Sequence, residues 1–178
     1  MTGIIKVDTI QNNGGTTGLT IDSSGRVLTP ARPAFNVNGI AGGDATMSGN
    51  SSPSSPFFIT HNTADLNQGN CWSSSTGKFT APIGGVYHFY ATITYKNKNE
   101  RWVSGGFFDD SGNAYTTSEY HGMSLMDDVE GTTQYASVQP SMTILLSANN
   151  TVRVGAFSDD GDAGLWNPGH HFGGFLVG

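Results

Sequence analysis

The stretch Gly77-Lys-Phe-Thr-Ala-Pro-Ile-Gly-Gly-Val-Tyr-His-Phe-Tyr90 decides how the rest of the chain is interpreted. A Pro-Ile-Gly-Gly turn at 82–85 separates two short β-prone segments, and side chains alternate along the second of them, residues 86–90. The adjacent Gly84 and Gly85 let the backbone turn sharply where a side chain would collide. The stretch therefore predicts the start of a central strand in a β-sandwich.

The composition also indicates an all-β protein. Of the 178 residues, 12% are charged and 25 are glycine, and the sequence has no runs of strong helix formers. The length allows one good-sized domain with an appendage. The single cysteine, Cys71, excludes an internal disulfide, so we expect packing or oligomerisation to supply the stability.

Charge and hydropathy argue against two classes of partner. The net charge of −6 and the scattered Lys and Arg residues do not suit a nucleic-acid surface. No apolar run reaches the length of a membrane span, and the first five residues lack the pattern of a signal peptide. We expect a protein that is made in a cytoplasm and does not insert into membranes.

The opening stretch and its surroundings resemble the signature of the C1q-like globular domain. In that signature, aromatic residues, an Asn or Asp, and Gly-x-Tyr-x-Phe follow one another with fixed gaps. Two positions depart from it, because His61 stands where Phe is usual and Ala91 replaces the last aromatic residue. Six residues fall at the expected spacing: Asn67, Trp72, Phe79, Gly85, Tyr87 and Phe89.

Both ends of residues 31–178 extend this resemblance. Ala34-Phe-Asn-Val37 resembles the family's first strand, and His171-Phe-Gly-Gly-Phe-Leu-Val177, with Phe172, Gly174 and Phe175, resembles its last. The resemblance implies an all-β jelly-roll sandwich of the C1q/tumour necrosis factor type that forms a homotrimer. It places aromatics such as Tyr87 and Phe89 in the core and between subunits, and we assign these two side chains opposite directions on their strand.

The remaining strands are predicted from short apolar runs between turns. Residues 38–56, rich in Gly, Ser, Asn and Pro, are expected to form a surface loop, and the charged residues 96–101 are expected to form a hairpin tip. The predicted strands are 57–59, 91–95 as a continuation of the central strand, 102–108, 114–120, 134–138, 141–146 and 151–157.

Residues 1–29 are interpreted as an extended N-terminal docking arm, and residues 30–178 as the C1q-like head. Ile5–Gln11, together with Leu19–Leu28, resembles the N-terminal leader of structural proteins of tailed bacteriophages. Asp22-Ser-Ser-Gly25 predicts the turn of a small hairpin, and so few short strands cannot bury a core alone. The apolar residues expected to dock are Ile4, Ile5, Val7, Ile10, Leu19, Ile21, Val27 and Leu28.

Two groups of residues are candidates for a metal site. Asp159, Asp160 and Asp162, and separately Asp109, Asp110 and Asn113, carry oxygen ligands of the kind that calcium prefers; plain solvated turns account for the same residues. His170 and His171 could serve a transition metal only across a trimer axis, because neighbours in a strand point to opposite faces. No other cofactor is expected.

No motif supports catalysis, so we expect a protein that is not an enzyme. Exposed aromatics near predicted loops could stack on sugar rings, although core packing accounts for most of them. The candidates are Trp102, Tyr115, Tyr120 and Trp166.

These observations predict a non-enzymatic surface protein of a bacteriophage virion. We expect a homotrimeric capsid decoration, cement or head-fibre protein, whose arms dock on the major capsid protein and whose heads face outward for host-surface glycans. One alternative is a tail-fibre receptor-binding tip mounted on a tail protein through the same arm. Another is a free soluble C1q-like lectin or ligand, against which the missing signal peptide and collagen-like repeat argue.

Overall fold

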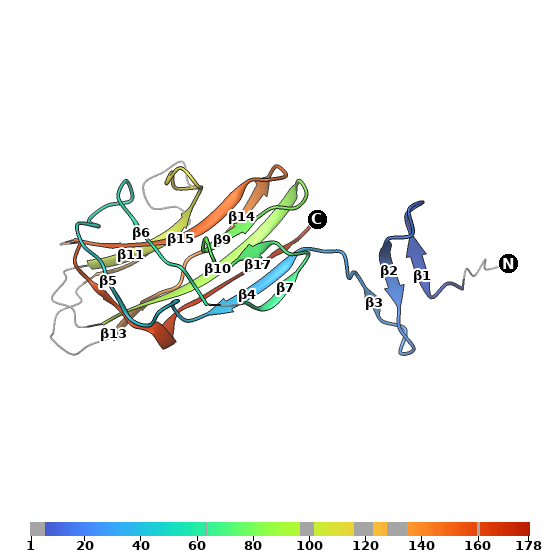
Figure 1. Cartoon of the computed structure of the whole chain (residues 1–178), viewed down its shortest axis with the longest axis horizontal. Helices are drawn as coiled ribbons and strands as arrows, with labels where there is room; N and C mark the ends of the chain where they lie inside the picture. Colours follow the sequence, from blue (N-terminus) through green and yellow to red (C-terminus); the bar gives the residue numbers. More distant parts are fainter. Residues whose placement is uncertain (1–5, 63, 97–101, 116–122, 128–134, 160) are drawn as a thin grey trace.

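The computed structural model describes residues 6–62, 64–96, 102–115, 123–127, 135–159 and 161–178. They form a two-layer β-sandwich, the head, and a separate three-stranded sheet that lies beyond one end of it (Figure 1). In this part of the chain the only helical element is one short 3₁₀ turn, η1 (Asn167–Gly169). No helix among the described residues is long and apolar enough to span a membrane. The predicted all-β class is confirmed.

One layer of the head, the front sheet, is eight-stranded and is organised around β10 (Gly85–Lys96). This strand is 12 residues long and has antiparallel partners along both edges. β17 (His171–Leu176) pairs with one edge, and β14 (Ser141–Leu146) pairs with the other. The other strands of the front sheet are β4 (Ala34–Asn38), β5 (Ala45–Thr46), β7 (Ala64–Gln68), β13 (Tyr135–Val138) and β16 (Gly164–Leu165).

The second layer, the back sheet, is six-stranded. Its centre is the antiparallel pair β11 (Trp102–Phe108) and β15 (Thr151–Ser158). Along both strands consecutive side chains are buried, so both faces of this pair are covered over most of its length. The flanking strands are β6 (Phe57–Phe58), β8 (Trp72–Ser73), β9 (Lys78–Thr80) and β12 (Met123–Asp127).

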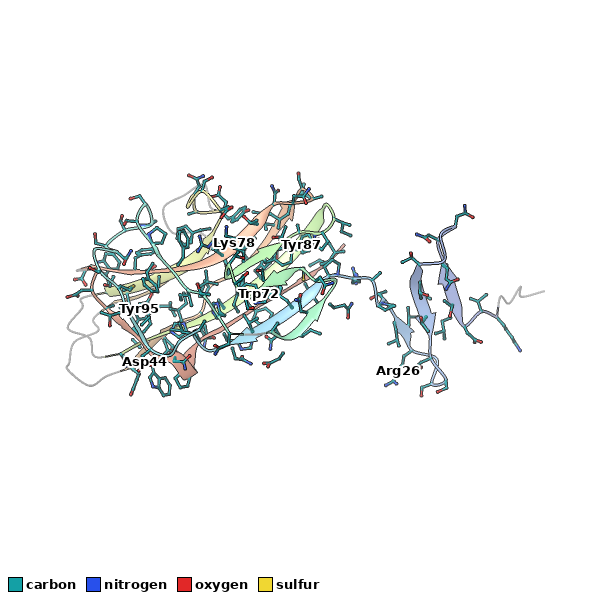
Figure 2. All side chains as sticks on the ribbon, in the orientation of Figure 1. Arg26, Asp44, Trp72, Lys78, Tyr87 and Tyr95 are labelled. Carbon is teal, nitrogen blue, oxygen red and sulfur yellow. The ribbon has the colours of Figure 1, made fainter. Side chains whose placement is uncertain are left out.

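Aromatic side chains form the core between the two sheets. Phe35 lies at its centre, stacked on Trp72 with a ring-centroid distance of 5.3 Å and an angle of 3° between the planes. Phe172 meets the Phe35 ring edge-on at 4.8 Å. Such pairs stabilise a core beyond the area that they bury. Figure 2 shows that the core runs along the head, with Tyr87 toward the arm end and Tyr95 toward the far end.

The strand predictions are confirmed for the long alternating segments, and the short strands account for the differences. The range 38–56, expected to be a loop, contains β5, which pairs with β16. The predicted strand 114–120 is described only at its start, where Ala114 forms an isolated bridge with Phe108. Residues 97–101 of the predicted hairpin tip lie outside the described residues.

The sheet beyond the head, the arm sheet, consists of β1 (Thr9–Gln11), β2 (Thr17–Ile21) and β3 (Val27–Leu28). The turn between β2 and β3 is organised by Asp22, whose Oδ1 accepts hydrogen bonds from the backbone N–H groups of Ser24 and Arg26, each at 2.9 Å. This arrangement explains why the sequence Asp-Ser-Ser-Gly folds back here, and it confirms the predicted hairpin.

Candidate subunit interface and docking arm

The outer face of the front sheet carries side chains that an isolated head leaves at its surface. Along β10, alternate residues from Tyr87 to Tyr95 point into the core, whereas His88 and Tyr90 point outward and are half-buried. The register of β17 places Phe175 beside His88 and Gly173 beside Tyr90. Aromatic and imidazole rings therefore lie next to one another on the outside of the sheet.

Four of these outward side chains, His88, Tyr90, His171 and Phe175, form a continuous row, the aromatic row. The ring centroids of Phe175 and His88 are 5.5 Å apart, those of His88 and Tyr90 are 6.4 Å apart, and those of Tyr90 and His171 are 5.5 Å apart. Tyr90 lies directly over Gly173, because a Cβ atom at 173 would be only 2.4 Å from the Tyr90 Cζ and hydroxyl oxygen. The glycine thus allows the ring to lie flat on the sheet.

The strands that border the aromatic row carry few ionic side chains. No Asp, Glu, Lys or Arg is found among the outward residues of β4, β14, β17 and residues 85–92 of β10. Charged side chains stand further out, with Lys96 at the end of β10 and Asp65 on β7. Several large apolar side chains are exposed at the rim, including Leu145 at 74% and Leu66 at 46%. A contiguous patch with aromatics and without ionic side chains is typical of the buried centre of a protein interface.

A search of known protein families matches residues 44–177 to the C1q domain. The chain belongs to the C1q domain family. The match covers well over half of the chain and includes most of both sheets of the head. No curated protein matches the chain.

Solved structures of other proteins share the C1q-type fold. The globular domain of zebrafish complement 1qA is 16% identical, with 82% of this chain and 98% of that chain covered and a TM-score of 0.57. Eiger TNF from S. frugiperda is 17% identical, with 83% and 94% covered and a TM-score of 0.60. Murine APRIL is 12% identical, with 82% and 99% covered and a TM-score of 0.57. These likenesses confirm the jelly-roll fold of the C1q/tumour necrosis factor type.

The residues that carry the C1q signature lie in two places. Trp72, Phe79 and Phe172 are buried in the core, whereas Phe175 is 44% exposed and belongs to the aromatic row. Asn67 stands on the surface, where its side-chain amide donates to the Trp72 carbonyl and accepts from the Trp72 N–H, both at 3.0 Å. Asn67 therefore closes the turn that carries Trp72 into the core.

Two glycines of the signature make room for close contacts. A Cβ at Gly174 would lie 2.5 Å from the Phe89 ring, and a Cβ at Gly85 would lie 2.6 Å from Leu176 Cδ1. Both distances are shorter than real side chains tolerate. The packed Phe89 ring leaves no room for a side chain at Gly174, whereas at Gly85 the flexible end of Leu176 would have to move.

The expectation that Tyr87 and Phe89 point in opposite directions is wrong. Both are fully buried, and their rings stack 6.1 Å apart on the core side of β10. Residues two apart in a strand share a face. The side chains that leave the core are their neighbours His88 and Tyr90, which the sequence analysis did not single out, although the strict alternation of β10 would have identified them.

His61, the departure from the C1q signature, is fully buried. It lies among Trp72, His170 and Phe172, with ring centroids 5.7–6.4 Å away. Neither of its ring nitrogens has a hydrogen-bond partner among the described residues. Burial, with smaller contributions from the charges of His170 and His171, lowers the pKa of His61 to about 3. His61 is therefore neutral near pH 7 and takes the place of an aromatic hydrocarbon.

The candidate metal ligands do not gather into a site. No group of three or more His, Cys, Asp and Glu side chains suited to a metal ion occurs in the described part of the chain, and Asp160 lies outside it. The Asp109 carboxylate accepts from the backbone N–H groups of Ser111 and Asn113 and from the Asn113 side chain at 2.8–2.9 Å. Its oxygens thus serve the turn itself.

The histidine pair is likewise divided between the two sides of the sheet. His170 is buried, where its Nε2 lies 3.1 Å from the Thr94 carbonyl oxygen. His171 points outward and its Nε2 is hydrogen-bonded to Asn36 Oδ1. The structure therefore does not bring the two rings together on one face.

An exposed aromatic pair lies at the end of the head opposite the arm. The rings of Tyr135 and Trp166 are 4.8 Å apart, and Tyr135 is 60% exposed. β13, which begins with Tyr135, lies toward that end (Figure 1). Trp166 directly follows β16. Trp166 is one of the glycan candidates from the sequence. Tyr135 is not, because its segment predicts only a strand. Of the other candidates, Trp102 packs on Phe157, Tyr115 is half-buried and Tyr120 lies outside the described residues.

The candidate docking residues of the arm are mostly exposed. Val7, Ile10, Val27 and Leu28 are 40–60% exposed, and Leu19 and Ile21 are half-buried, whereas Ile4 and Ile5 lie outside the described residues. The turn residue Arg26 stands well away from the head (Figure 2). The arm sheet therefore presents apolar side chains that its own three strands do not cover.

Proposed function

We propose that the protein is a non-enzymatic surface protein of a bacteriophage virion. Three copies associate through the front sheets of their C1q heads, and their arms dock on the major capsid protein. The heads then face outward as a decoration, cement or head-fibre protein, made in the cytoplasm of the bacterial host and located on the virion surface. The observation that carries this proposal is that both parts of the chain expose apolar side chains. On the head these form the aromatic row, and on the arm they are the exposed aliphatic residues.

The aromatic row supports self-association. Leaving the aromatic rings of this sheet face in water is costly, and covering them with the same face of another copy removes aromatic area from water. Trimers of this kind are what the resemblance to the C1q and tumour necrosis factor families implies. The trimer would also supply the stability that a chain without a disulfide cannot obtain from crosslinks.

The arm supports docking on a particle. Its strands are too short to bury a core alone, and its sequence resembles the leader of tailed-phage structural proteins. A partner that covers its exposed aliphatic residues would gain the corresponding hydrophobic energy. β13, which carries Tyr135, lies at the end of the head opposite the arm (Figure 1), so a docked arm leaves the pair of Tyr135 and Trp166 free to stack on host-surface glycans.

Sedimentation of the purified protein tests the trimer. We expect three times the chain mass of 18.7 kDa. Tyr90→Lys places a charge in the centre of the aromatic row and should yield monomers, because an unpaired charge would have to be buried on assembly. Thr80→Lys, on an exposed site of β9 in the back sheet, adds the same charge away from the row and should remain trimeric. A monomeric parent protein would contradict the proposal.

The number of copies per virion separates capsid mounting from the alternative, a tail-fibre tip that uses the same arm. Quantitative mass spectrometry of purified particles should find a number comparable with that of the capsid subunits. A number comparable with that of tail fibres would favour the tail-fibre tip. Absence from the particles would favour a free lectin-like ligand and overturn the virion assignment.

A further inference from the structure

One face of the arm sheet carries four aliphatic side chains at paired positions. In the register of the sheet, Ile10 lies opposite Leu19, and Ile21 lies opposite Val27. Directly opposed residues share a face, as do Leu19 and Ile21, which are two apart on β2. These four residues therefore form one surface, the aliphatic face. The opposite face carries Thr9, Thr20 and Leu28.

The arm sheet has nothing in its own chain to cover the aliphatic face. Its strands are 3, 5 and 2 residues long, and Ile10 and Val27 are 53% and 60% exposed. A sheet with one apolar side becomes stable only when a second layer packs on that side. One carboxylate borders the aliphatic face, because Asp8 is two residues before Ile10 and its backbone carbonyl accepts from the Ile21 N–H at 2.8 Å. Asp8 is exposed, so identical faces can pack through the four aliphatic side chains with the Asp8 carboxylate left in water at the edge.

The linker between the arm sheet and the head is fastened to the head. The Leu176 N–H donates to the Pro33 carbonyl at 3.0 Å, and the Gln68 side-chain amide donates to the Arg32 carbonyl at 2.5 Å. Arg32 in turn donates to the Val177 carbonyl. These bonds hold the last residues of the linker at the end of the front sheet where β17 ends, and this is also the end of the head that faces the arm (Figure 1).

A pocket with apolar and polar lining connects the arm sheet to the aromatic row, and Leu28, Arg32 and Gln68 are among its residues. The pocket, of about 510 Å³, lies at the junction and is lined by residues of the arm, the linker and the front sheet. Val27 belongs to both the pocket and the aliphatic face, and Phe175 belongs to both the pocket and the aromatic row. The surface that would join the heads is thus contiguous with the uncovered surface of the arm.

We propose that the aliphatic faces of three copies pack against one another around the trimer axis and form a short stalk below the heads. This inference rests on the trimer of the proposed function. Three heads that meet through the front sheet bring three fastened linkers to one axis, and the short linker then gives each arm an effective local concentration of the order of millimolar for the other two. The other copies are therefore the partners that the aliphatic face meets first.

The stalk divides the apolar residues of the arm into two sets. Ile10, Leu19, Ile21 and Val27 are buried between copies, whereas Val7, Leu28 and the threonine face remain on the outside. The outer set is then the surface that contacts the particle. Substitutions in the two sets are expected to have different effects, since only the inner set affects the association of the arms.

Cysteine crosslinking in the full-length protein tests the stalk with a matched pair of variants. Ile21→Cys places a thiol on the aliphatic face, and Thr20→Cys places one on the other face at the neighbouring, equally half-buried position. The native Cys71 is buried, which raises the pKa of its thiol to about 11, so it stays unreactive. Under mild oxidation, Ile21→Cys should give covalent dimers on a non-reducing gel, whereas Thr20→Cys should stay at the level of the parent protein.

Sedimentation of the same samples separates failure of the stalk from failure of the trimer. Trimers in which both variants crosslink equally, or in which neither does, would overturn the stalk and leave the proposed function intact. Monomers would overturn the trimer and the stalk together. As a second measurement, Ile21→Asp should make trypsin cleave faster after Arg26, whereas Thr20→Asp should leave the rate unchanged; equal rates would contradict the stalk.

Discussion

At the scale of single residues, His61 links the core of this protein to its pH response. Its ring is surrounded by aromatic residues and has no hydrogen-bond partner among the described residues. Burial is the main reason that its pKa falls to about 3, and burial likewise lowers the pKa of His170 to about 4. Both rings are charged in the unfolded chain below the ordinary histidine pKa of about 6.5. Acid therefore favours unfolding through these two residues.

Replacing His61 with Phe should make the protein more resistant to acid. Because the pKa is lower in the folded state, the stability contributed by neutral His61 is complete above about pH 6.5 and is lost as the pH falls toward 3. The loss from this one residue is about 3 kcal/mol between about pH 7 and pH 4. Thermal melting across that range should show a flatter pH dependence in His61→Phe. A profile as steep as that of the parent protein would contradict this account.

Two adjacent glycines of β17 should separate assembly from folding. Gly173→Ala forces the Tyr90 ring off the outer face, where it can swing into solvent, so we expect weaker association of the subunits. Gly174→Ala pushes a methyl group into the packed Phe89 ring inside the core, which should reduce the free energy of unfolding by about 1–3 kcal/mol. Sedimentation and thermal melting of both variants measure the two effects. Identical behaviour would contradict the division between the outer and inner faces.

At the scale of elements, the link between arm and head depends on Gln68 at the end of β7. Its side-chain amide bonds the Arg32 carbonyl and lies 3.4 Å from the Thr29 carbonyl. Gln68→Ala should therefore loosen the linker and speed its cleavage by proteinase K within residues 28–32, followed by mass spectrometry, with little change in the melting of the head. The exposed Gln139→Ala is the matched control and should leave the cleavage rate unchanged. Equal cleavage of both variants would show that Gln68 does not hold the linker.

The elements that the sequence predicted well are those whose pattern is local. Apolar and polar residues alternate in β10 from Ala91 to Lys96 and in β14 from Ser141 to Ile144, and the Asp22 turn carries its own hydrogen-bond acceptor. The two-residue strands β5 and β16 have no such pattern. They exist because β10 offers a free edge at Tyr95 and Lys96. β16 pairs with this edge, and β5 in turn pairs with β16. Pairing of this kind depends on tertiary contacts that a single sequence does not reveal.

The candidate interface illustrates the same limit on prediction. Alternation along β10 is enough to place His88 and Tyr90 opposite Tyr87 and Phe89. The row itself also needs the register of β17, which brings Phe175 beside His88 and Gly173 beneath Tyr90. That register follows from the order of strands in the whole sheet. A short aromatic motif therefore identifies the fold, whereas the candidate interface can be recognised only in the assembled sheet.

At the scale of the whole molecule, the proposed trimer makes stability depend on concentration. When unfolding also separates three chains, each tenfold rise in protein concentration stabilises each chain by about two-thirds of 1.4 kcal/mol. For a chain of this length we expect the melting temperature to rise by about 2–4 °C per tenfold step. Scanning calorimetry over a hundredfold range of concentration measures this slope.

Variants at the aromatic row should remove this concentration dependence without unfolding the head. Tyr90→Lys leaves the core side of β10 untouched. In the separate head, the aliphatic stem of the new lysine can lie along the sheet while its ammonium group reaches water. We expect its melting temperature to be the same at every concentration, whereas Thr80→Lys should keep the slope of the parent protein. A parent protein without a slope would mean that the outer face of the front sheet does not join subunits, and the stalk of three arms would then have no axis around which to form.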